Sequence, residues 1–241
     1  MKIIIAKDYR SMSARAAWLV IKQIQKKQGS VLGLATGDTP LGLYQNLEAA
    51  YKLKKISFKK ITTFNLDEYV ALAKSNKNSY YQYMQRNLFK HINIDKKNIY
   101  LPNGQAKDFK KECKNYEKMI KKAGDIDLQI LGIGIDGHIG FNEPGSSFKS
   151  GVHAVNLTSS TRQVNADHFK SLKDVPKKAI TMGLSTIMQA KKILLLASGK
   201  DKADIVAQAL KGKITKQVPA SILQKHPNLT VILDKPAASL L

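Results

Sequence analysis

Short apolar segments alternate with helix-like stretches along the whole chain of 241 residues. The strand-like segments are rich in Ile, Leu and Val, and several lack polar alternation, as in strands buried on both faces. They are Lys2–Ala6, Val31–Ala35, Lys60–Asn65, Asn98–Leu101, Asp127–Gly132, His153–Leu157, Ala179–Met182, Ile193–Ala197 and Thr230–Leu233. The strongest helical patterns are Ser13–Gln28, Pro40–Lys54, Asn78–Phe89, Ala106–Lys122 and Lys200–Leu210.

This alternation predicts an α/β fold with a mostly parallel sheet and helices on both faces. Neither a repeat nor a Gly/Ser-rich linker divides the chain, so we expect a single domain over residues 1–241. Trp18 is expected in the core on the first helix. Because ligands bind outside the carboxyl ends of strands in such sheets, the segments that follow strands should carry the chemistry.

The net charge of +22 raises the possibility of a nucleic-acid partner. However, 36 of the 40 basic residues are lysines, and specific base readout favours arginine. The lysines are spread along the chain, without a basic tail or interleaved stacking aromatics. We therefore expect a solvated lysine-rich surface that attracts anionic substrates, and no specific nucleic-acid partner.

Other composition features indicate a cytoplasmic protein without a membrane partner. No apolar run approaches the roughly 20 residues that span a bilayer, and the apolar stretch at the N-terminus is too short for a signal peptide. The single cysteine, Cys113, excludes an internal disulfide and a cysteine-cluster metal site, and no role is assigned to it.

The turn after the second strand-like segment has features of a phosphate cradle. Gly37 can adopt a positive φ, Thr36 and Thr39 offer hydroxyl groups, and free N–H groups of the following helix would point into the same space. Thr39 is a plausible N-cap, with Pro40 at the first helical position. An ordinary strand-to-helix turn explains the segment about as well, and the carboxylate of Asp38 would repel a phosphate.

Two acids, Asp67 and Glu68, follow the third strand-like segment. Adjacent side chains point in different directions in any regular conformation, so one of the two is expected to face a strand-end cleft. A carboxylate there could act as a general base. A helix N-cap or a surface acid is the alternative, and local sequence alone favours it.

A glycine-rich loop follows the strand-like segment Asp127–Gly132 and contains the spacing G-x-G-x-x-G at Gly132, Gly134 and Gly137. A dinucleotide site is rejected because the residues after Gly137 do not read as a helix. In addition, the next strand-like segment lacks the terminal acid that would contact a ribose.

Asp136, His138 and Glu143 lie in this loop and could be brought together by its glycines. A histidine flanked by carboxylates has a defined tautomer and can shuttle protons near neutral pH. The same three residue types could instead bind a metal, or His138 could satisfy buried backbone groups. Catalysis is the preferred interpretation, with a metal second and a structural role third.

Five segments together resemble the glucosamine-6-phosphate deaminase family, and the likeness runs from about residue 1 to residue 234. The segments are Leu34–Pro40 (LATGDTP), Phe64–Tyr69 (FNLDEY), Asn78–Tyr81 (NSYY), Gly134–Pro144 (GIDGHIGFNEP) and Ser221–Pro227 (SILQKHP). The resemblance implies a Rossmann-like fold, shared with 6-phosphogluconolactonases. It also implies the conversion of D-glucosamine 6-phosphate and water to D-fructose 6-phosphate and ammonia, without a metal or other cofactor.

The resemblance also implies catalytic roles. Asp67 matches the base that moves a proton between C2 and C1 of the opened sugar. His138 matches the group that helps to open the pyranose ring. Asp136 and Glu143 match carboxylates that orient His138 and balance its charge.

For the phosphate, Arg162 and Lys202 match ligands of the family, and the turn of Thr36, Gly37, Asp38 and Thr39 would supply backbone and hydroxyl donors. The family more often has Ser or Arg at position 38, so Asp38 is expected to weaken phosphate binding rather than to relocate it.

Family members that are activated by N-acetylglucosamine 6-phosphate bind it between subunits, partly through basic residues beyond the Glu-Pro loop. His153 and Val155 stand at those positions here, so we expect no such activation. The oligomeric state is left open between a monomer and a small homo-oligomer. Alternative functions are a 6-phosphogluconolactonase, and a non-catalytic sugar-phosphate sensor or nucleic-acid binder.

Overall fold

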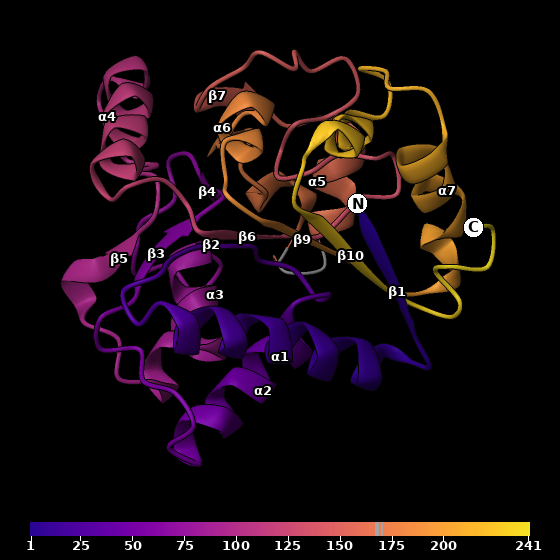
Figure 1. The fold of residues 1–241 in the computed structure, drawn as a ribbon. Helices are drawn as coiled ribbons and strands as arrows, with labels where there is room; N and C mark the ends of the chain where they lie inside the picture. Colours follow the sequence, from indigo (N-terminus) through magenta and orange to yellow (C-terminus); the bar gives the residue numbers. More distant parts are fainter. Residues whose placement is uncertain (167–168, 170) are drawn as a thin grey trace.

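The computed structural model describes residues 1–166, 169 and 171–241 and contains two β-sheets surrounded by helices (Figure 1). The larger sheet has seven strands in the order β1-β10-β9-β6-β2-β3-β5, and all its neighbours are parallel. Its strands are β1 Lys2–Ala6, β2 Val31–Leu34, β3 Thr62–Asn65, β5 Ile99–Tyr100, β6 Leu128–Leu131, β9 Ile193–Ala197 and β10 Leu229–Asp234. The predicted mostly parallel sheet is confirmed.

The smaller sheet has the order β4-β8-β7, and both of its strand pairs are antiparallel. It consists of β4 Asp67–Tyr69, β8 Lys178–Thr181 and β7 His153–Asn156. The sequence did not indicate β4, which has only three residues and follows β3 after the single residue Leu66. Exposed and partly buried residues alternate in β7, which is typical of an antiparallel strand with one solvated face.

Helices cover both faces of the larger sheet, as predicted (Figure 1). In β9, Leu194 and Leu196 join the core beneath α1 Tyr9–Lys26, α2 Leu41–Lys52 and α3 Tyr80–Asn87. Ile193, Leu195 and Ala197 face the other core, under α4 Phe109–Lys122, α6 Leu184–Met188 and α7 Ala203–Lys211. Burial on both faces explains why these strands lack polar alternation.

One further α-helix and several short 3₁₀ turns connect these layers. They are α5 Ser159–Asn165, η1 Phe89–His91, η2 Lys96–Asn98, η4 Leu172–Asp174, η5 Lys200–Lys202 and η6 Pro219–Lys225. Among the described residues, no helix is long and apolar enough to cross a lipid bilayer.

Two local predictions are wrong. Helix α2 begins at Leu41 and has Pro40 as its N-cap, so Pro40 lies one residue before the first helical position and Thr39 makes no cap. Trp18 is 44 % exposed rather than buried, because the inner face of α1 is occupied by small and aliphatic side chains. The guanidinium of Arg15 lies 4.6 Å from the centre of the Trp18 ring, a cation–π contact at the surface.

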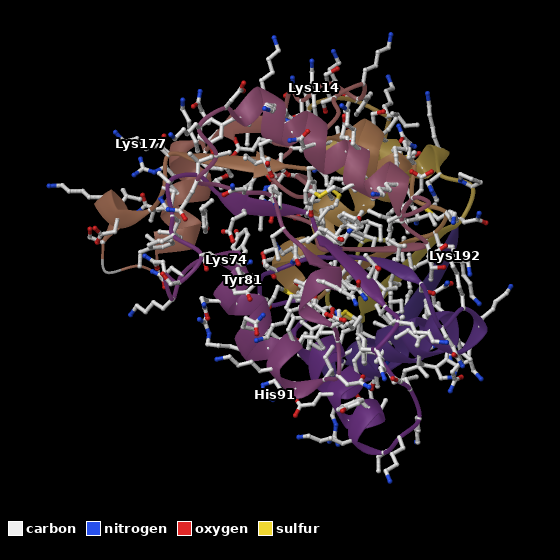
Figure 2. The ribbon with its side chains drawn as sticks, turned by 90° about the vertical axis from the view of Figure 1, so that its left-hand side faces the viewer. Lys74, Tyr81, His91, Lys114, Lys177 and Lys192 are labelled. Carbon is white, nitrogen blue, oxygen red and sulfur yellow. The ribbon has the colours of Figure 1, made fainter. Side chains whose placement is uncertain are left out.

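The lysine side chains are distributed over the surface rather than gathered at one place. Figure 2 shows Lys114, Lys177 and Lys192 pointing away from the molecule in different directions. In the same view Lys74 lies beside Tyr81, with its ammonium 4.0 Å from the ring centre. This distribution fits a solvated cationic surface.

Candidate active site

Four neighbouring strands of the larger sheet, β9, β6, β2 and β3, end at the same edge. A cavity of about 460 Å³ opens there, within the usual range for small-molecule sites. Its wall includes segments that follow each of these strands: the Thr36–Thr39 turn after β2, Asp67 after β3, the glycine-rich loop after β6 and Lys202 after β9. Residues far apart in the sequence are thus brought to one space by strand order.

Asp67 is the first residue of β4 and lines the cavity, although only 6 % of its surface is exposed. It is neither a helix N-cap nor a surface acid. No described residue donates a hydrogen bond to its carboxylate or forms an ion pair with it. Burial, and secondarily the charge of Glu68, raises the pKa of Asp67 to about 8. A buried carboxyl with a raised pKa, open to a cavity, is suited to general acid–base work.

Gly140 explains how the glycine-rich loop approaches this carboxyl so closely. Its φ is +58°, and a Cβ added there would lie 2.8 Å from Thr181 Oγ1 and 3.4 Å from Asp67 Oδ2. Thr181 is the register partner of Asp67 across β4 and β8. A side chain at position 140 would therefore crowd the carboxyl of Asp67.

Asp136 and His138 form the predicted pair within the same loop. His138 Nδ1 lies 2.6 Å from Asp136 Oδ1, and both residues line the cavity. The hydrogen bond from His138, opposed by partial burial, lowers the pKa of Asp136 to about 2. Because the Asp136 carboxylate accepts a hydrogen bond from Nδ1–H, the neutral ring carries its proton on Nδ1 and Nε2 can accept a proton from a ligand.

Glycines fold this loop over the imidazole. A Cβ at Gly134 would lie 2.1 Å from the ring of His138, and Gly134 N–H donates to His138 O at 2.9 Å. Gly137 has a φ of +84° and its carbonyl accepts from Ala220 N–H. The glycines thus serve close approach and tight turning.

Glu143 is not brought to His138. It is buried, and its Oε1 accepts from the hydroxyl of Thr161 at 2.6 Å and from the hydroxyl of Thr158 at 3.1 Å. Thr161 lines the cavity, whereas Glu143 does not. Glu143 therefore contacts the start of α5 rather than His138 among the described residues, and the catalytic role expected for it stays a prediction.

The Thr36–Thr39 turn forms one wall of the cavity, and tyrosine hydroxyls hold its backbone in place. Tyr83 from α3 donates to Gly37 O at 2.6 Å, and Tyr9 from α1 donates to Asp38 O at 3.1 Å. Gly37 has a φ of +90°, as a tight turn requires. A cradle fixed in this way could hold a phosphate through N–H and hydroxyl donors.

The described cations at the cavity include one of the two that the resemblance implies, Lys202, but not the other, Arg162. Lys202 lines it, and burial, opposed by Asp201 and Asp136, lowers the pKa of its ammonium. Arg162 does not line it in the described part of the chain, because its guanidinium donates to Leu172 O at 2.8 Å and to Val175 O at 3.3 Å. Arg86, at the end of α3, lines it instead and was missed by sequence reasoning.

Tyr69, Tyr80 and Phe141 form an aromatic wall that sequence reasoning also missed. The rings of Tyr80 and Phe141 are stacked with centroids 6.1 Å apart, and the hydroxyls of Tyr69 and Tyr80 are 3.3 Å apart. Burial raises the pKa of Tyr80 well above its usual value, so its hydroxyl stays protonated. These rings line the cavity beside Asp67 with mostly apolar surface.

Glu68, the neighbour of Asp67, anchors this wall. Its carboxylate accepts backbone N–H groups of Tyr69, Tyr80 and Tyr81 at 2.9 to 3.0 Å. It thereby fixes the start of α3 against β4. Of the two adjacent acids, one therefore faces the cavity and the other serves the structure.

The segment Ser221–Pro227 also has a structural explanation. His226 is buried, and its Nε2 atom lies 2.8 Å from Ala190 O. Its Nδ1 atom accepts a hydrogen bond from Asn228 N–H at 3.2 Å. Neither of these contacts reaches the cavity.

Among the described residues, no three His, Cys, Asp or Glu side chains are grouped as a metal ion would need.

The family model described as "Glucosamine-6-phosphate isomerases/6-phosphogluconolactonase" matches residues 7–232. The chain therefore belongs to this family. The mostly parallel sheet with helices on both faces is the α/β fold of this class.

Among curated relatives, glucosamine-6-phosphate deaminase of Thermoanaerobacter pseudethanolicus is 54 % identical over 241 residues, covering 100 % of this chain and 95 % of the relative. The deaminase of Clostridium novyi is 56 % identical over 239 residues, covering 99 % of each chain. A solved structure described as a monomeric glucosamine-6-phosphate deaminase is 48 % identical, with a TM-score of 0.98 and full coverage of both chains.

A 6-phosphogluconolactonase from Thermotoga maritima shares the fold with a TM-score of 0.75, covering 97 % of this chain and 98 % of that one. At 22 % identity this likeness concerns the fold alone.

Proposed function

We propose that the chain, as one domain over residues 1–241, is a glucosamine-6-phosphate deaminase. It converts D-glucosamine 6-phosphate and water to D-fructose 6-phosphate and ammonia. The observation that carries the proposal is that the carboxyl of Asp67, which has no partner among the described residues, and the Asp136-braced imidazole of His138 line one cavity. The relatives at 54 % and 56 % identity support the same reaction.

His138 opens the pyranose ring. Its free Nε2 accepts the proton of the O1 hydroxyl, the C1–O5 bond breaks, and the proton is delivered to O5. Asp136 holds the ring in the required tautomer and stabilises the imidazolium formed between these steps, as its strongly lowered pKa allows.

Asp67 then moves a proton between adjacent carbons. As a carboxylate it removes the proton from C2 of the open chain, and as an acid it returns a proton to C1. The amino nitrogen releases one N–H proton and O1 takes up one, which leaves an imine at C2 and a CH2OH group at C1. Water then adds at C2, its second proton passes to the nitrogen, and ammonia leaves as the C2 carbonyl forms. A pKa of about 8 lets the carboxyl work in both directions near neutral pH.

The phosphate anchors the sugar at a distance from these steps. The Thr36–Thr39 turn and Lys202 line the same cavity and offer the N–H, hydroxyl and ammonium donors that a phosphate needs. Binding energy from the phosphate can thereby orient C1 and C2 over the catalytic groups.

The test is to supply glucosamine 6-phosphate to the purified chain and to measure ammonia and fructose 6-phosphate together. We expect equal amounts of both, and no hydrolysis of 6-phosphogluconolactone in a parallel assay. Lactone hydrolysis without ammonia release would favour the lactonase instead. Binding of fructose 6-phosphate without turnover would favour the sensor.

We also propose that the chain acts as a monomer without activation by N-acetylglucosamine 6-phosphate. The 48 % identical structure described as monomeric supports the first part. For the second, His153 is bound to its own loop, with Nδ1 2.9 Å from Gly151 O. Sedimentation with and without N-acetylglucosamine 6-phosphate, together with initial rates, tests both. A rise in rate or in mass with this compound would contradict the proposal.

A further inference from the structure

Asp38 presents an electrostatic problem at the proposed phosphate position. It lines the cavity within the Thr36–Thr39 turn, so its negative charge lies near any phosphate held there. It forms no ion pair with a described residue. The arginine expected from the resemblance, Arg162, donates instead to two backbone carbonyls outside the cavity wall. Of the two cations that the resemblance implies, Lys202 is then the one that lines the cavity in the described part of the chain.

Arg86 supplies a second cation on the same side as the turn. It lies in the last turn of α3, lines the cavity and is oriented by donation from Nη1 to Lys77 O at 2.6 Å. That bond engages one of the five N–H donors of the guanidinium. The others remain for an anion at the mouth of the cavity.

Tyr83 links Arg86 to Asp38. It lies one helical turn before Arg86 and donates its hydroxyl to Gly37 O at 2.6 Å, which fastens α3 to the turn that carries Asp38. Burial raises the pKa of Tyr83, the Asp38 carboxylate adds to the rise, and the Arg86 guanidinium opposes it. Because Gly37 directly precedes Asp38, this hydrogen bond brings the end of α3 that carries Arg86 to the turn that carries Asp38.

We propose that Arg86 is the counter-charge of Asp38 and a binding residue for the phosphate of the substrate. It offsets the repulsion that Asp38 would otherwise exert and offers N–H donors to the phosphate oxygens. The inference rests on the proposed function, because it names a specificity-determining residue of the same site. It adds that Arg86 is needed because position 38 is acidic.

The test is a double-mutant cycle of Arg86→Gln and Asp38→Asn with glucosamine 6-phosphate. Arg86→Gln alone should raise KM about tenfold, since it leaves Asp38 facing the phosphate unbalanced. In the Asp38→Asn background the same change should raise KM only about twofold. An equal effect in both backgrounds, or none, overturns the proposal.

Arg15→Gln is the matched control, because it removes the same charge from the Trp18 contact on α1, outside the cavity wall. It should leave KM unchanged. Arg86→Lys keeps the charge but loses the planar fork, so its KM should lie between those of wild type and Arg86→Gln. Melting temperatures check that all variants fold.

Two readouts separate this inference from the proposed function. Inhibition by inorganic phosphate should weaken in Arg86→Gln by about the same factor as KM rises. Binding of fructose 6-phosphate, measured by calorimetry, should weaken in parallel even if turnover is absent. If the chain binds fructose 6-phosphate in an Arg86-dependent way but releases no ammonia, the inference stands and the proposed function fails. If ammonia is released and binding is independent of Arg86, the reverse holds.

Discussion

Two buried aspartates at opposite edges of the larger sheet differ in every contact they make. Asp127 directly precedes β6 and accepts hydrogen bonds from Lys27 Nζ at 2.6 Å, Lys191 Nζ at 2.8 Å and Val31 N–H at 2.8 Å. Asp67, at the carboxyl edge, receives none from the described residues. Burial alone would raise the pKa of Asp127, but hydrogen bonds from the two lysines lower it, whereas the pKa of Asp67 rises to about 8.

The difference teaches which charges serve the fold and which serve chemistry. At the edge of the sheet where the strands begin, Asp127 connects the end of α1 and the segment before β9 through two lysines, and β2 through a backbone N–H. At the carboxyl edge, an acid is kept buried with no hydrogen-bond donor among the described residues, which costs stability and leaves the group reactive. The largest effects should therefore come from Asp67.

Replacing Asp67 should separate binding from chemistry. Asp67→Asn keeps the shape and removes the base, so kcat should fall about 10³-fold while the affinity for fructose 6-phosphate changes little. Steady-state rates and calorimetry measure the two quantities. Nearly unchanged turnover would contradict the role given to Asp67.

The same variant should change how stability depends on pH. The folded-state pKa of about 8 exceeds the ordinary aspartate value of 3.8, so between these values the folded chain holds a proton that the unfolded chain has lost. This contribution is complete below pH 3.8 and is lost as the pH rises through 8. Asp67→Asn should therefore melt above wild type near pH 8, and the gap should narrow towards pH 5. A gap independent of pH would contradict this.

The sequence predicted the larger sheet and the segments that line the cavity, because both depend on composition and spacing. Runs such as Ile193–Ala197 indicated strands buried on both faces, and acids or histidines after strands marked the cavity wall. The second sheet was missed because β4 is very short. Arg86 was missed, and of Asp67 and Glu68 the sequence could not say which faces the cavity, because both questions depend on where α3 packs, which no local pattern states.

Removing the paired acid should affect the fold and not the chemistry. Asp127→Asn keeps an acceptor for Val31 N–H but loses the charge between two lysines. Because both lysines are about half exposed, the loss of unfolding free energy should be only about 1–2 kcal/mol. Urea unfolding measures this, and kcat should equal that of wild type. Lost turnover in a folded variant would show that the two edges are not independent.

Asp234 shows that the hydrogen-bond donors around an acid, and not its position at the carboxyl ends of the strands, decide the role of that acid. It ends β10 at the carboxyl edge, but its carboxylate accepts from Gly199 N–H at 3.1 Å and from Ala237 N–H at 2.9 Å, and also from the hydroxyl of Ser198. These bonds hold Gly199, with its φ of +99°, at the start of the turn that carries Lys202.

Asp234→Asn should loosen that turn and so displace the Lys202 ammonium from the phosphate. KM for glucosamine 6-phosphate and the inhibition constant of inorganic phosphate should both rise about threefold, with kcat nearly constant. Asp204→Asn, on the exposed face of α7, removes an equal charge nearby and should change neither. If Asp234→Asn lowered the melting temperature but left both constants unchanged, Asp234 would resemble Asp127. A satisfied acid at this edge would then serve the fold alone.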